Sequence, residues 1–159
     1  MIDTRNKAMS LTEALTWRAR EPGPVVFTNG VFDLLHPGHV ELLEAARREG
    51  SALIVGVNSD ESVRQLGKGR DRPLNGEAAR ARVLAGLAAV DCVVLFDEDT
   101  PLELIQQLAP DVLVKGADYV RSAIVGADLV ESRGGRIVRV PLVSGFSTSA
   151  IVERLRAST

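Results

Sequence analysis

The stretch VVFTNGVFDLLHPGHVELLEAARREG, residues 25–50, combines the pattern of a buried strand with that of a helix. Its opening apolar run is continuous, which is typical of a strand that is covered on both faces. Further along, apolar residues recur at helical spacing until Gly50, a residue type that commonly ends helices. Both histidines of the chain, His36 and His39, lie at the turn between the two patterns.

The same order of strand and helix repeats along the chain. Strands are predicted over residues 24–29, 52–58, 92–96, 111–115 and 136–141, and helices over 10–20, 38–50, 75–90, 100–110, 122–135 and 147–158. The last strand alternates apolar and charged residues, which places it near a sheet edge. This alternation predicts the α/β class, with a Rossmann-like, doubly wound, five-stranded parallel sheet and helices on both faces. The chain is expected to be a single domain, 1–159, with a flexible N-terminus over 1–9.

Capping residues indicate where three of the helices begin. Ser10 and Glu13 have the spacing of a capping box. Asn75 is the expected cap of the helix over 75–90. Thr100 is the expected cap of the following helix, with Pro101 at its first position.

The bulk composition restricts the class of protein. The 159 residues have a formal net charge of −2 and 25% charged residues, which gives no general attraction to nucleic acid or to an anionic membrane. The single cysteine, Cys92, lies in an apolar run and is expected to be buried; it excludes an internal disulfide. The N-terminus lacks the apolar core of a signal peptide, and no apolar run is long enough to span a membrane. We therefore expect a cytoplasmic protein.

In doubly wound sheets, ligands bind beyond the carboxyl ends of the strands, so the histidine turn is a candidate site. Pro37 suits a first helical position, which places His36 and His39 at the start of the helix. A helix start carries about half a positive charge and unpaired N–H groups, which favour phosphate. Gly30 allows a ligand to approach the backbone closely. Zinc is a weaker alternative, because no third and fourth ligands lie at an obvious spacing.

Two motifs carry a resemblance to a known superfamily. The segment FTNGVFDLLHPGH, residues 27–39, matches the HxGH signature of the cytidylyltransferase-like nucleotidyltransferase superfamily. The segment SGFSTSAIVERL, residues 144–155, resembles the second signature of that superfamily, a Ser/Thr-rich loop entering the last helix. More narrowly, residues 57–75, 90–119 and 134–149 resemble the D-glycero-β-D-manno-heptose 1-phosphate adenylyltransferase family.

The sequence departs from the pattern of these relatives at two places. Some relatives have an Arg-Thr pair and an acidic residue where this chain has Leu142, Val143 and Ser144, so an anchoring arginine is absent there. Ala117 stands where the heptose relatives typically have a second glycine. No sugar-kinase half accompanies the transferase part, which implies a stand-alone transferase.

The resemblance implies a reaction and a set of site residues. An oxygen of a sugar 1-phosphate would attack the α-phosphorus of ATP, and pyrophosphate would leave. The implied catalytic residues are His36, His39 and Lys68. The implied nucleotide and phosphate ligands are Thr28, Asn29, Gly30, Phe32, Gly38, Arg72, Lys115, Gly116, Asp118, Ser147, Thr148 and Ser149, and Asp33 and Asn58 are the implied substrate ligands.

The resemblance also implies Mg²⁺, which ATP phosphates would mainly hold, because no carboxylate cluster has an obvious metal spacing. The expected partners are ATP and a sugar 1-phosphate, without nucleic acid or membrane, in a homodimer or higher homo-oligomer. A bound triphosphate would raise the pKa of both imidazoles above the ordinary value of about 6.5.

Structural explanations compete with several of these roles. The glycine-rich loop over 67–73 has the composition of a solvated surface loop, and Ser147 could be a helix cap alone. Asp33 and Asn58 are residue types that favour turns. Arg80 lies on a predicted helix and is expected to be a surface ion-pair partner.

Other functions also remain open. A cytidylyltransferase for glycerol 3-phosphate or a similar phosphorylated alcohol, or a phosphopantetheine adenylyltransferase, would use the same motifs, and assays with ATP and CTP would separate them. A non-catalytic nucleotide-binding domain would not need the histidines and Lys68 together.

Overall fold

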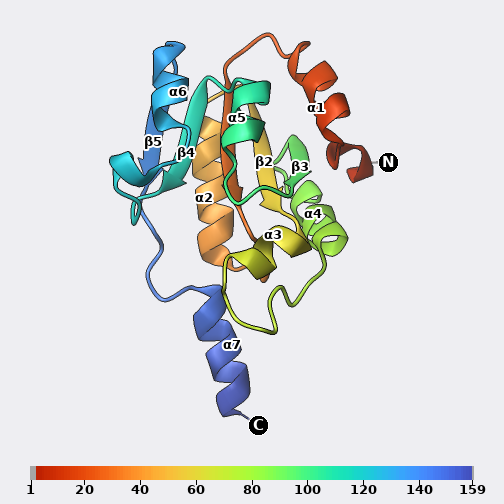
Figure 1. Cartoon of the computed structure of the whole chain (residues 1–159), viewed down its shortest axis with the longest axis vertical. Helices are drawn as coiled ribbons and strands as arrows, with labels where there is room; N and C mark the ends of the chain where they lie inside the picture. Colours follow the sequence, from red (N-terminus) through yellow and green to blue (C-terminus); the bar gives the residue numbers. More distant parts are fainter. Residues whose placement is uncertain (1–2, 159) are drawn as a thin grey trace.

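The computed structural model describes residues 3–158 and has at its centre a five-stranded parallel sheet (Figure 1). The strand order is β3-β2-β1-β4-β5, and neighbouring strands pair in parallel. The strands are β1 (Val25–Gly30), β2 (Ala52–Asn58), β3 (Cys92–Phe96), β4 (Val112–Gly116) and β5 (Arg136–Val140). The predicted fold class is confirmed, and β5 lies at an edge of the sheet, as its alternating pattern indicated.

Helices connect and flank the strands. The α-helices are α1 (Leu11–Arg18), α2 (Pro37–Arg48), α3 (Asp60–Gln65), α4 (Glu77–Ala85), α5 (Leu102–Leu108), α6 (Ala127–Ser132) and α7 (Thr148–Ala157), with short 3₁₀ helices η1 (Arg5–Lys7) and η2 (Arg121–Ala123). Helix α3 was not predicted, because its six residues are too few to show a helical period. None of the helices within residues 3–158 is long and apolar enough to cross a membrane.

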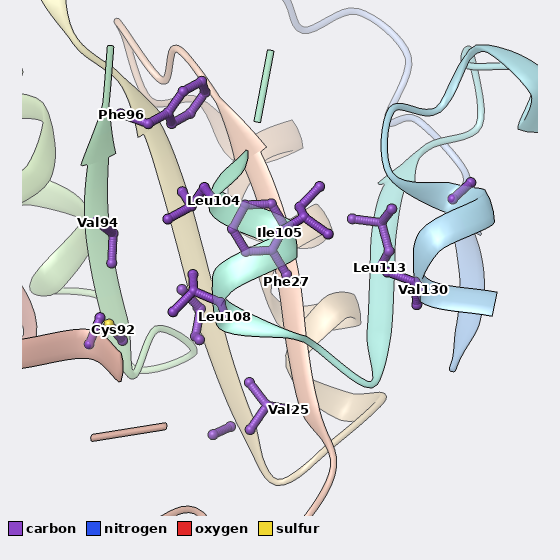
Figure 2. Packing of buried hydrophobic residues seen from close by; sticks show 14 of the residues in the cluster. Val25, Phe27, Cys92, Val94, Phe96, Leu104, Ile105, Leu108, Leu113 and Val130 are labelled. Carbon is purple, nitrogen blue, oxygen red and sulfur yellow. The ribbon is translucent and has the colours of Figure 1, made fainter. Parts of the chain in front are cut away.

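Helices cover both faces of the sheet and create two apolar clusters. On one face, side chains of α1, α5 and α6 pack against Phe27, Ile54, Val94 and others that point to that side (Figure 2). On the other face, α2 and α4 pack against the alternate residues of the same strands, such as Val55. Burial on both faces explains why β1 to β4 are continuous apolar runs, whereas the edge strand β5 alternates. Cys92 belongs to the first cluster and is fully buried, as expected.

The chain changes direction across the sheet between β1 and β4. From β1 it proceeds through β2 to β3 on one side, and then returns to β4 and β5 on the other. In such sheets the helices diverge at this point and leave a crevice beyond the strand ends. Helix α7 has no buried residues and projects from the body of the protein (Figure 1). Its first residues lie near the carboxyl ends of β1 and β4. Its first turn is therefore available to the crevice.

The predicted caps are confirmed in one case and corrected in two. Ser10 and Glu13 form the full capping box of α1. Gly76, and not Asn75, occupies the cap position of α4, since the Asn75 side chain donates to the carbonyl of Asp33. Pro101, and not Thr100, is the residue that precedes the first turn of α5.

Part of the N-terminal segment contacts the sheet. Residues 1 and 2 lie outside the described part of the chain. The amide of Met9 donates to the carbonyl of Val93 at 2.9 Å, and Ala8 forms a parallel bridge with the same residue. The ammonium of Lys7 donates to the carbonyls of Leu87 and Val90. These contacts cover the outer edge of β3, and the flexibility expected for residues 1–9 stays a prediction.

Arg80 is buried, contrary to the surface position expected from the sequence. Its side chain is 0% exposed and donates to the carbonyls of Val31 and Asn75 and to the Asp60 carboxylate. The helical pattern of a sequence indicates on which side of the helix an arginine lies, but not which residues it contacts. The partners of Arg80 lie on three separate segments of the chain. Arg80 thus joins the end of β1, α3 and the loop before α4.

Replacing Arg80 with methionine is expected to lower the free energy of unfolding by about 2–4 kcal/mol, because the buried carbonyl of Val31, the partly buried carbonyl of Asn75 and the Asp60 carboxylate lose their donor. Urea denaturation measures this loss. Arg82→Met is the matched control: Arg82 lies on the exposed side of the same helix, and the change is expected to stay within about 0.5 kcal/mol. Equal losses in the two variants would contradict the role of Arg80.

Candidate active site

A cavity of about 590 Å³ lies at the carboxyl ends of β1 and β4, at the change of direction in the sheet. That volume is in the usual range for a small-molecule site. The cavity is lined by every predicted site residue except Asn58: Thr28, Asn29, Gly30, Phe32, Asp33, His36, Gly38, His39, Lys68, Arg72, Lys115, Gly116, Asp118, Ser147, Thr148 and Ser149. The structure therefore brings together residues that are up to 121 positions apart, Thr28 and Ser149.

The two imidazoles stack at the start of α2. His36 precedes the helix in an extended conformation, Pro37 occupies its first turn, and His39 lies in that turn. The ring centroids of His36 and His39 are 3.8 Å apart, with an interplanar angle of 23°. The Nδ1 atoms of both rings are buried and have no hydrogen-bond partner in the described part of the chain. Because no internal acceptor fixes their tautomers, these rings can present N–H groups to a ligand.

Burial keeps these imidazoles neutral in the free protein. Burial lowers the pKa of His36 below its ordinary value. For His39, burial and the neighbouring His36 lower the pKa to about 4. The ring of Phe32 meets His39 edge-on at 5.3 Å between centroids, which adds to its apolar surroundings. An anion placed beside the rings would reverse this effect, since it favours the protonated form.

The turn before α7 lies directly against the histidine turn. The Thr148 hydroxyl donates to the carbonyl of Leu34, and the Ser147 hydroxyl accepts from the amide of Ala150 as a helix cap. The ring of Phe146 stacks over His36 at 6.2 Å between centroids. The N-termini of α2 and α7 therefore face one cavity, and their partial positive charges add there.

The loop over residues 67–75, which we call the flap, contributes two cations. Lys68 lies between Gly67 and Gly69, both with positive φ, and the space beside Gly67 is open. Partial burial and the charge of Arg72 lower the pKa of the Lys68 ammonium, while Asp33 opposes the shift. The Arg72 Nε donates to the Asp33 carboxylate at 2.7 Å. Arg72 is thus paired within the protein, although its position at the cavity was predicted.

A third cation lies at the end of β4. The ammonium of Lys115 donates to the carbonyl of Asn29 at 3.1 Å and lies 5.3 Å from the centroid of the Tyr119 ring. Burial lowers the pKa of Lys115 to about 8; Asp118 raises it, and Lys68 lowers it further. Asp118 and Lys68 therefore act on Lys115 in opposite directions, and burial dominates the shift.

Three predicted ligands have side chains that are committed to protein partners. Asn58 is not among the residues that line the cavity, and its amide donates to the Ser62 hydroxyl in α3, so its expected contact with substrate stays a prediction. Asp33 lines the cavity, but both of its carboxylate oxygens accept hydrogen bonds from the flap. The Thr28 hydroxyl donates to the carbonyl of Val114 and joins β1 to β4. An Asx or Thr at a strand end looks alike in sequence whether it binds ligand or backbone.

Apolar residues line the mouth of the cavity, and the sequence analysis missed them as site residues. They are Val31, Leu42, Tyr119, Leu142, Val143 and Phe146. Tyr119 and Phe146 are 45% and 46% exposed, unusual for aromatic residues in a chain with only 4% of them. Their rarity and their place beside the Lys115 and Ser147 motifs are the signals that could have found them. The rings of Tyr119 and Phe146 offer flat surfaces against which a nucleotide base could stack.

The described residues offer no protein cage for a metal. Among residues 3–158, no three His, Cys, Asp or Glu side chains form a group that could hold a metal ion. The carboxylates that line the cavity are Asp33 and Asp118, and Asp33 is already bound by the flap. This donor set fits a magnesium ion that would be coordinated mainly by water and by the oxygens of a bound ligand.

Comparison with known sequences gives close relatives. The protein is 58% identical over 139 residues to the bifunctional protein HldE of Gluconobacter oxydans (strain 621H), an alignment that covers 87% of this chain and 29% of the relative. It is 56% identical over 153 residues to the bifunctional protein HldE of Koribacter versatilis (strain Ellin345), covering 96% of this chain and 31% of that one. The chain thus spans less than a third of the length of these curated relatives.

Comparison with solved structures supports the same grouping. The crystal structure of the lipopolysaccharide core biosynthesis protein from Thermoplasma volcanium matches with a TM-score of 0.63 and 26% identity, over 76% of this chain and 97% of that one. Pantothenate synthetase from Thermus thermophilus shares the fold, with a TM-score of 0.57 and 22% identity, over 92% of this chain and 70% of that one. The model of the family described as Cytidylyltransferase-like matches residues 27–154. The chain therefore belongs to the cytidylyltransferase-like family of nucleotidyltransferases.

Proposed function

We propose that the protein is an adenylyltransferase that transfers AMP from ATP to D-glycero-β-D-manno-heptose 1-phosphate. The products are ADP-heptose, which serves the synthesis of the lipopolysaccharide core, and pyrophosphate. The observation that carries this proposal is the convergence of His36 and His39 with the turn over Ser147–Ser149 on one cation-rich cavity. The choice of substrate is supported by the heptose-family motifs and by the 56–59% identity to the HldE proteins.

The reaction is an in-line displacement at phosphorus. A phosphate oxygen of the sugar 1-phosphate forms a bond to the α-phosphorus of ATP as the bond to the bridging oxygen of pyrophosphate breaks, and pyrophosphate leaves with that electron pair. The attacking phosphate is already ionised at neutral pH, so no general base is required. Catalysis then consists of positioning and of stabilising charge on the phosphoryl oxygens.

Each candidate phosphate ligand has a position that suits part of the triphosphate. The stacked imidazoles of His36 and His39 line the cavity at the start of α2 and are assigned to the α- and β-phosphates. Lys68 approaches from the flap and is assigned to the α-phosphate, while the first turn of α7 receives the outer phosphates. A magnesium ion held mainly by the ATP oxygens would help to neutralise the charge of the leaving pyrophosphate.

The same proposal includes the surroundings of the reaction. Lys115, Gly116 and Asp118 at the end of β4 are assigned to the nucleoside, with Tyr119 as a stacking surface. Close approach is built in at Gly116, where an added Cβ would lie 2.6 Å from the Asp118 carboxylate. Cytoplasmic location and assembly into a homodimer or larger homo-oligomer stay predictions from the sequence, and light scattering on the purified protein tests the latter.

The protein is expected to release pyrophosphate when it is incubated with ATP, Mg²⁺ and D-glycero-β-D-manno-heptose 1-phosphate. Parallel reactions with CTP, glycerol 3-phosphate and a panel of other sugar 1-phosphates measure the choice of base and acceptor. His39→Ala is expected to lower turnover by about 10²–10³-fold while ATP still binds, because a donor to the transition state is lost. Glu41→Gln, an exposed change on the same helix, is the control.

Two outcomes would contradict this proposal. Turnover with CTP and glycerol 3-phosphate instead would assign the chain to the cytidylyltransferase alternative. ATP binding without pyrophosphate release from any acceptor would favour a non-catalytic nucleotide-binding domain.

An NMR titration of the imidazole signals tests the electrostatics of the cavity. Without nucleotide, His39 is expected to protonate near pH 4, because burial disfavours its charged form. ATP is expected to raise the pKa of both histidines, so that its binding takes up protons as the pH falls below neutrality. Pyrophosphate should act in the same direction. Histidine pKa values that stay unchanged at saturating ATP would show that the rings do not contact the phosphates.

A further inference from the structure

We propose that Asp33 is a positioning residue that anchors the flap and thereby sets the place of Lys68 over the substrate. This inference rests on the proposed function for its kinetic consequences, but the anchor itself is a property of the protein alone. It assigns to Asp33 a role different from the substrate contact that the sequence indicated.

The Asp33 carboxylate binds the returning half of the flap. One oxygen accepts from the amides of Leu74 and Asn75 at 3.0 and 2.9 Å, and the other accepts from the amide of Leu74 at 2.9 Å and from Arg72 Nε at 2.7 Å. The side chain of Asp33 is 1% exposed. A buried carboxylate with these donors has a lowered pKa despite its burial, and stays ionised at neutral pH. A substrate hydroxyl would have to displace one of these donors.

A second set of contacts fixes the same half of the flap. The Asn75 side chain donates back to the carbonyl of Asp33 at 2.8 Å. The buried Arg80 donates to the carbonyl of Asn75 at 2.9 Å and to the carbonyl of Val31 at 2.7 Å. The loop between β1 and α2, which ends at His36, is therefore joined to the flap through both backbone and side chains.

The outer half of the flap has the opposite character. Residues 67–71 are exposed, both glycines in this stretch have positive φ, and the space beside Gly67 is open. The amide of Arg72, which follows this half, donates to the carbonyl of Gly69 at 3.3 Å. Asp71 makes an exposed ion pair with Arg156. The flap thus has two parts. Its base, residues 72–75, is held by hydrogen bonds to Asp33, and its arm, residues 67–71, is exposed and carries Lys68. The base determines where the arm begins.

Arg72 belongs to the fixed base of the flap. Its guanidinium is 12% exposed and is held by Asp33, so it acts in the anchor and not as a free phosphate ligand. Lys68 lies near enough for the charges of Arg72 and Asp33 both to affect its pKa. The ion pair therefore also sets the local potential around Lys68.

A double-mutant cycle separates anchoring from direct substrate contact. Asp33→Asn keeps the shape and one acceptor oxygen but removes the charge. We expect it to lower kcat/KM for ATP by about tenfold or more in the wild-type background. In a Lys68→Ala background the same change is expected to cost less than about threefold, because the arm no longer carries its cation. The KM for the sugar 1-phosphate should change less than the KM for ATP.

The cycle has outcomes that overturn the proposal. Equal costs of Asp33→Asn in the two backgrounds, or a change confined to the KM for the sugar 1-phosphate, would show that Asp33 contacts substrate. No cost in either background would show that the anchor is unimportant. Should Asp33→Asn unfold at a lower temperature than wild type, Arg72→Gln replaces it in the same cycle, with the same coupling expected.

Amide hydrogen exchange tests the anchor without any reaction. The amides of Leu74 and Asn75 are expected to exchange about tenfold faster or more in Asp33→Asn than in wild type, while amides of β1 stay protected. Unchanged exchange at Leu74 and Asn75 would overturn the anchor. Asp71→Asn, on the exposed arm, is the matched control and should alter neither amide. A wild-type protein that shows the anchor but turns over none of the substrates would refute only the proposed function.

Discussion

Positive charge gathered at one edge of the sheet is the constraint on which the site depends. Lys68, Arg72 and Lys115 line the same cavity as two stacked imidazoles, and the N-termini of α2 and α7 face it. Of the two carboxylates that line it, Asp33 is already occupied by the flap. Burial is the main cause of the lowered pKa values of His39 and Lys115, and the neighbouring His36 and Lys68, respectively, lower them further. A bound polyphosphate would relieve this repulsion.

The sheet makes this accumulation possible because its rigid parts lie directly behind the site. Thr28 joins β1 to β4 where the cavity begins, and Arg80 joins the end of β1 to α3 and to the flap. Both side chains are buried, and their partners are backbone or carboxylate oxygens. The groups that would meet substrate are instead on turns and helix starts. The buried hydrogen bonds thus belong to the scaffold, whereas the arm of the flap is exposed.

The sequence predicted the elements whose signal is local. Continuous apolar runs located four strands and an alternating run located the fifth, and the pair of histidines at a strand-to-helix turn indicated where the cavity lies, because these patterns depend on neighbouring residues. Arg80 was misjudged for the opposite reason: its partners lie on other segments, and no local pattern reports them. Helix α3 was too short for a period to appear. The roles of Tyr119 and Phe146 depend on the path of two loops, which only the folded chain shows.

The most direct measurement is a crystal structure with Mg²⁺ and an ATP analogue whose α,β-bridge is a methylene group. The account predicts that the α- and β-phosphates lie against the imidazoles of His36 and His39, with the outer phosphate at the first turn of α7. A triphosphate bound elsewhere, or one that touches only one of these two segments, would contradict the claim that they form a single phosphate-binding cavity.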